Sequence, residues 1–151
     1  MHHLLLMFTL ISFIGLVMSL TKYCFLLVGW ADPLGPFSRW LFPWMLVGVW
    51  IPAILAMGWL TKEQKGNWQV ALRGCPSWMR LLMYLFFGYA IFSYFFVKPI
   101  APQQGLPPGG RPPEAVLGHT GMIMAFFAIA TCIHYSAYRV ISVSRKEIGS
   151  E

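Results

Sequence analysis

The chain has 151 residues, of which 58% are hydrophobic and only 11% carry a formal charge, and its net charge is +6. A soluble domain of this composition would lack the polar residues needed to cover its surface. The positive charge could suggest nucleic-acid binding, but the basic residues lie in short segments beside apolar runs, where membrane proteins carry their topology signals. We therefore expect the lipid bilayer as a partner and no nucleic acid.

Charged residues avoid four long apolar runs, at residues 4–30, 42–60, 81–97 and 115–138, and Lys22 is the one formally charged residue inside these runs. Each run is long enough to cross a hydrocarbon core, which takes about 20 apolar residues. Together the runs fill more than half of the chain and leave no room for a separate soluble domain. We expect one all-α domain, an integral membrane four-helix bundle whose spans are residues 4–29, 42–60, 78–97 and 115–138.

The first span places Lys22 about 27 Å of helical rise from Leu4, so its ammonium group can reach the headgroups on the far side. Lys22 is therefore interpreted as a marker of the membrane boundary before it is considered for function. Gly29-Trp30-Ala31 has a faint likeness to a signal-peptidase site. No basic segment precedes the apolar run, which is also longer than that of a usual signal peptide, so we expect no cleavage.

The second span carries Pro52 near its middle, which removes a backbone hydrogen bond and predicts a kink. In the basic connection that follows, Trp68, Ala71 and Leu72 share one side of a short turn suited to the membrane interface. The third span is dense in Phe and Tyr, which favour bundle filling and lipid contact, although they could also line a ligand or quinone pocket. The Pro- and Gly-rich linker 98–114 must lie outside the hydrocarbon.

The distribution of Lys and Arg predicts the orientation of the chain. Seven of these residues fall on the side of the loop between the second and third spans, together with both termini, and four fall on the other side. Because cytoplasmic loops carry the excess of positive charge, we expect both termini in the cytoplasm.

Small residues form a stripe on the first span and another on the fourth. Such stripes let membrane helices approach closely, and they offer more surface than one small bundle needs, which favours self-association or a partner helix. The predicted helix-packing face comprises Ser12, Gly15, Ser19, Gly118, Gly121, Ala125, Ala128 and Cys132. The remaining arc of the fourth span, which suits lipid, comprises Met122, Phe126, Ile129 and Ile133.

Thr131, His134 and Tyr138 share a polar face near the cytoplasmic end of the fourth span. Ionisable residues inside spans are uncommon and often functional, so His134 is the best single functional candidate. The structural interpretation is stronger: a neutral His134 that hydrogen-bonds Thr131 or a backbone carbonyl. His119 lies about 22 Å away by helical rise, so the two histidines cannot share one small site.

Several kinds of chemistry are disfavoured, and we expect no catalytic residue, no metal site and no cofactor. All five acidic residues lie outside the spans, whereas cation- and proton-coupled transporters usually need an intramembrane carboxylate. The three cysteines are scattered and form no CxxC pair, which argues against a disulfide framework or a zinc site. A bis-histidine haem site would have to use His3, at a terminus where helices fray, as the partner of His134.

Three groups of residues carry a resemblance to a known class: Val49-Trp50-Ile51-Pro52; Cys75-Pro76-Ser77-Trp78-Met79 with Phe86-Phe87-Gly88-Tyr89-Ala90; and Gly118-His119 with Phe126-Phe127. On these patches the chain resembles small four-span bacterial inner-membrane proteins that have no assigned activity. The resemblance implies a bacterial inner-membrane location and carries no mechanism. The sequence favours a non-enzymatic interaction, assembly or accessory subunit. An oligomeric channel or carrier for a small solute is the alternative, and a haem- or quinone-binding subunit is the third possibility.

Overall fold

The computed structural model describes residues 2–28, 32, 35, 37–62, 68–96 and 113–148, which contain five α-helices and no strand. Four helices are long and apolar enough to cross a membrane, which confirms the expected all-α membrane bundle. Most of the Pro- and Gly-rich linker expected at 98–114 lies outside the described residues. The helices are α1 (His2–Val28), α2 (Phe37–Leu60), α3 (Trp68–Ala71), α4 (Ser77–Phe96) and α5 (Pro113–Ile148).

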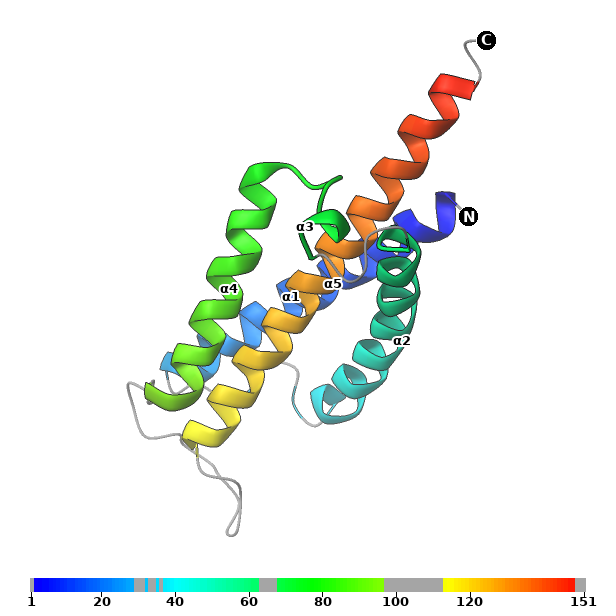
Figure 1. Ribbon diagram of the computed structural model, residues 1–151. Coiled ribbons are helices and arrows are strands. Elements are labelled where there is room, and N and C mark those ends of the chain that lie inside the picture. The colour runs from blue at the N-terminus through cyan, green and yellow to red at the C-terminus, as the bar shows by residue number, and fades with distance from the viewer. Residues whose placement is uncertain are drawn as a thin grey trace.

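The four long helices alternate in direction, as Figure 1 shows. The start of α1, the end of α2, the short α3, the start of α4 and the end of α5 lie toward one end of the bundle, which we call the basic end. Arg80 and Arg139 lie on α4 and α5 at this end, Lys62 follows the end of α2, and Arg73 follows the end of α3. An even number of crossings thus brings the first and last helices to the same end, and the cytoplasmic placement of that end stays a prediction.

The last helix, α5, is the centre of the bundle (Figure 1). It packs against α1, α2 and α4, while α1 also packs against α2. Because three helices surround α5, the lipid-facing arc expected on it was wrong. Ile129 and Ile133 are buried, and the ring of Phe126 meets the ring of Trp50 edge to face at a centroid distance of 5.3 Å.

The central helix is also longer than the predicted span. At about 1.5 Å per residue, its 36 residues extend roughly 54 Å, well beyond a hydrocarbon core of about 30 Å. Its apolar part covers Val116–Val143, and the last turns project past the other helices at the basic end (Figure 1).

The second helix runs without interruption through Pro43 and Pro52, so the kink expected at Pro52 stays a prediction. Its inward side is a stripe at helical spacing that joins the main hydrophobic core. This stripe comprises Phe42, Val49, Ala53, Ala56 and Leu60.

The connection between α2 and α4 folds back onto the bundle. Ala71 and Leu72 are fully buried, and α3 packs against both α2 and α5. The backbone N–H of Gly74 donates to the hydroxyl of Ser136 at 3.0 Å, which fixes the following turn on α5. The turn expected at the membrane interface therefore buries part of its apolar side against protein, because the small side chains of α5 leave room for it.

Candidate functional site

The strongest functional candidate, His134, is fully buried between α5 and α1. Its Nδ1 lies 3.2 Å from the hydroxyl of Ser12, and its ring stacks on Phe8 at a centroid distance of 5.5 Å. Its Nε2 is buried and has no hydrogen-bond partner among the described residues. His134 thus links α5 to α1, and its partner is Ser12 rather than the expected Thr131 or a backbone carbonyl.

The other two residues of the predicted polar face do not converge on His134 through any described hydrogen bond. Thr131 is buried and donates its hydroxyl to the carbonyl of Phe127, one turn back on the same helix, at 2.7 Å. Tyr138 is half-buried, and its ring lies 6.4 Å from that of Tyr135. The three side chains therefore share a helix face without forming one site.

The space beside the imidazole of His134 is filled by protein, which disfavours the channel alternative. A solute path along Thr131, His134 and Tyr138 would need open space beside the imidazole, where Phe8 and Ser12 pack instead. The described residues contain no group of three His, Cys, Asp or Glu side chains that could hold a metal ion. His119 is exposed on the first turns of α5, away from His134.

All eight residues of the predicted helix-packing face are buried: Ser12, Gly15, Ser19, Gly118, Gly121, Ala125, Ala128 and Cys132. A Cβ atom built on Gly15 would lie 2.5 Å from the ring of Phe127, and one on Gly118 would lie 3.1 Å from Cα of Tyr94. The first contact joins α1 to α5, and the second joins α4 to α5. The small residues are thus used for packing inside one chain.

Two cysteines that the sequence separates by 57 positions meet at the basic end. The thiol of Cys75 donates to the carbonyl of Cys132 at 3.0 Å, and the thiol of Cys132 points to the carbonyl of Met79 at 3.8 Å. Both thiols are free and buried, and they connect the turn before α4 to α5. The sequence contains no local signal for this pair, because the contact depends on the connection folding back.

Lys22 has a structural partner that the sequence analysis missed. Its Nζ lies 2.7 Å from the carboxylate of Asp32 and 5.5 Å from the centroid of the Phe42 ring. Its side chain is only 12% exposed. The ammonium group is therefore neutralised by Asp32 within the protein, and the interpretation of Lys22 as a simple boundary marker is incomplete.

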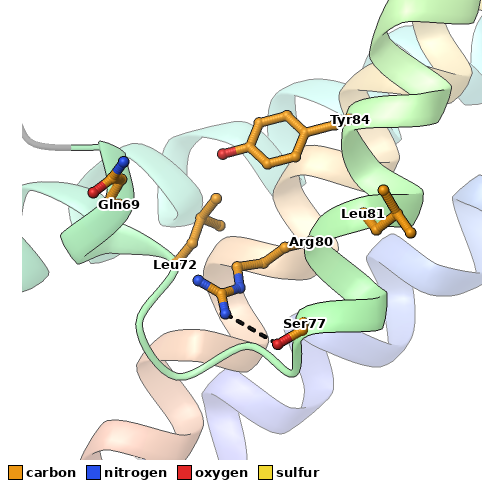
Figure 2. Close-up of a pocket in the computed structure, with 6 residues that line it drawn as sticks. All are labelled: Gln69, Leu72, Ser77, Arg80, Leu81 and Tyr84. Carbon is orange, nitrogen blue, oxygen red and sulfur yellow. Dashed lines mark hydrogen bonds between the residues drawn. The ribbon is translucent and has the colours of Figure 1, made fainter.

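The described residues also form a wide-open cavity of about 470 Å³ between α3 and the first turns of α4, and Gln69, Ser77, Leu81 and Tyr84 in its lining are exposed. Figure 2 shows Arg80 and Tyr84 extending from α4 toward α3, which carries Gln69. The lining is completed by Leu72, Ser77 and Leu81. Sequence reasoning assigned no binding site to this region, although the spacing of its α4 residues places them on one helix face.

Comparison with models of protein families, with curated proteins and with solved structures finds no match to this chain.

Proposed function

We propose that the protein is a non-enzymatic accessory or assembly subunit of a membrane complex. It acts by packing the outward face of α2 against a helix of another membrane protein, either a partner or a second copy of itself. The two termini lie in the cytoplasm of a bacterial cell and the spans in its inner membrane. The excess of Lys and Arg at the basic end supports this orientation.

The packing inside the bundle limits the surfaces on which such a contact can form. The small residues of α1 and α5 are already covered by neighbouring helices of the same chain. They are therefore not available to an outside helix, and the interaction surface must lie elsewhere on the bundle.

The outward face of α2 is the observation that carries the proposal. It is an exposed stripe opposite the buried side of α2, with spacings of three and four residues, and comprises Trp44, Gly48, Ile51, Leu55 and Gly58. A Cβ atom added at Gly48 or at Gly58 would meet no atom within 4 Å. Glycines on a lipid-exposed face allow another helix to approach its backbone closely, and the large apolar residues between them supply van der Waals contact.

The test is native mass spectrometry of the full chain purified in mild detergent, which detects both copies of the chain and co-purifying proteins. We expect the wild type to carry a second protein, and the double variant Gly48→Leu/Gly58→Leu to lose it. Leucine favours a helix more than glycine does, so the double variant should still fold.

Gly88→Leu is the matched control, because Gly88 is an exposed glycine on α4 that also has no atom within 4 Å of an added Cβ. This variant should keep the associated protein. A wild-type chain found only as a monomer, with nothing bound, would contradict the proposal.

A further inference from the structure

The cavity between α3 and α4 has the polar groups of an anion-binding site. Arg80 contributes the guanidinium group, Gln69 an amide, and Ser77 and Tyr84 hydroxyl groups, and all four line the same space (Figure 2). Arginine presents N–H donors in a planar fork that matches phosphate oxygens, and the three uncharged side chains can add hydrogen bonds.

Not every N–H donor of the Arg80 guanidinium group has a hydrogen-bond acceptor among the described residues. Its Nη2 donates to the hydroxyl of Ser77 at 3.3 Å, while its Nε is buried and has no hydrogen-bond partner among the described residues. Within those residues, the only ion pair joins Lys22 to Asp32, in α1 and the turn after it. The buried Nε cannot itself be reached from the cavity, but Arg80 lines the cavity and forms no ion pair among the described residues, so an anion there would compensate its charge.

The position of the cavity relative to the membrane identifies the kind of anion. Ser77 is the first residue of the third span, so the cavity lies where that span enters the membrane at the basic end. Trp59 near the end of α2 and Trp78 near the start of α4 both lie toward the basic end and are exposed, as expected for side chains at headgroup level. On α4, exposed Leu81 belongs to the lining of the cavity and exposed Leu85 follows one turn further along the helix, so an acyl chain can lie on them.

We propose that this cavity binds the phosphate group of an anionic phospholipid, with Arg80 as its main ligand and the acyl chains along α4. Basic pockets at the ends of membrane helices are suited to such headgroups. A phosphate group could also come from a soluble ion, and the experiment below separates the two sources.

The experiment titrates the full chain in mild detergent with phosphatidylglycerol and follows the bound lipid by native mass spectrometry. Phosphatidylcholine with the same acyl chains serves as the lipid control. We expect phosphatidylglycerol to bind more tightly than phosphatidylcholine. Arg80→Gln should lower the affinity for phosphatidylglycerol by about tenfold, because a charge-assisted contact is lost.

Arg73→Gln is the matched variant. It removes the same charge at the same end of the bundle, from an exposed residue that does not line the cavity. Its affinity for phosphatidylglycerol should stay within about twofold of the wild type, because exposed charges contribute little. Equal losses in the two variants would indicate general surface attraction and overturn the proposal, as would an unchanged affinity in Arg80→Gln.

Tyr84→Phe keeps the proposal testable if Arg80→Gln does not fold. It removes one hydroxyl from an exposed side chain and should lower the affinity for phosphatidylglycerol about two- to fivefold. An unchanged affinity in this variant would count against the site. Finally, inorganic phosphate at millimolar concentration should not displace the lipid. Displacement would identify a soluble phosphate as the ligand and overturn the assignment to a phospholipid.

Discussion

The helices α5 and α4 both cross the membrane, yet 78% of the residues in an apolar 18-residue window of α5 are buried inside the protein, against only 17% in the corresponding window of α4. Apolar content does not explain the difference. The corresponding window of α1 is the most apolar of the four, with a mean hydropathy of 2.3, and 22% of its residues are buried. Lipid solvates apolar side chains as well as a protein interior does, so hydrophobicity cannot select the central helix.

Side-chain size explains the difference better. Gly118, Gly121, Ala125 and Ala128 let neighbouring backbones approach α5 from more than one side. On α4 the large rings point outward, and its buried positions are limited to Met83, Ala90 and Ser93. Small residues therefore mark the centre of this bundle, and large aromatic residues mark its rim.

The largest expected effect comes from the same substitution made on both helices. Phe127 on α5 is fully buried against Gly15 of α1, whereas Phe95 on α4 is 70% exposed. Phe127→Ala should lower the free energy of unfolding by about 3 kcal/mol, because it leaves a cavity. Phe95→Ala should change it by less than about 0.5 kcal/mol. Unfolding in SDS, followed by tryptophan fluorescence, measures both, and equal losses would contradict the comparison.

The next substitutions add side-chain volume to the bundle instead of removing it. Gly118→Leu should destabilise the bundle by about 2 kcal/mol, because its side chain would meet the backbone of α4 at Tyr94. Gly88→Leu, on the outward side of α4, should cost nothing or stabilise the helix slightly. The same SDS titration compares the two variants. A clear loss of unfolding free energy in Gly88→Leu would mean that the outward face of α4 is covered by protein.

The sequence was sufficient for the helices, because they depend on patterns within one segment. The stripe from Gly118 to Cys132 and the charge-free runs are local features of this kind. The lipid-facing arc of α5 was assigned wrongly, because one stripe specifies a single packed side and does not reveal that other helices approach from further sides. Ile129 and Ile133 are buried for that reason.

Pairings between distant residues could not be predicted at all. The contact between Ser12 and His134 joins residues 122 positions apart, and the contact between Cys75 and Cys132 joins residues 57 positions apart. Neither pair has a spacing or motif that identifies its partner. The cavity around Arg80 was missed for a related reason, because it exists only once α3 folds back toward the start of α4.

A smaller effect is expected where α5 is joined to α1 by a polar contact. Ser12→Ala leaves Nδ1 of His134 without this partner and should cost about 1 kcal/mol of unfolding free energy. Ser19→Ala is the matched control, since Ser19 is equally buried and its described hydrogen bond goes to the carbonyl of Leu16 in its own helix. Equal losses of unfolding free energy in the two variants, measured by SDS unfolding, would show that the contact between Ser12 and His134 does not stabilise the bundle.

The smallest expected effect concerns the polar contact between the rim helix α4 and α1. The hydroxyl of Tyr23 donates to that of Tyr89 at 3.1 Å, and Tyr89→Phe should cost about 0.5 kcal/mol, which is typical of side-chain hydrogen bonds within membranes. Tyr94→Phe on the same helix, where the side chain is exposed, should have no measurable effect in the same SDS titration. If Tyr89→Phe also has none, the stability of α4 in the bundle depends on its packing against α5, and size complementarity between small and large side chains is then sufficient to hold the rim to the centre.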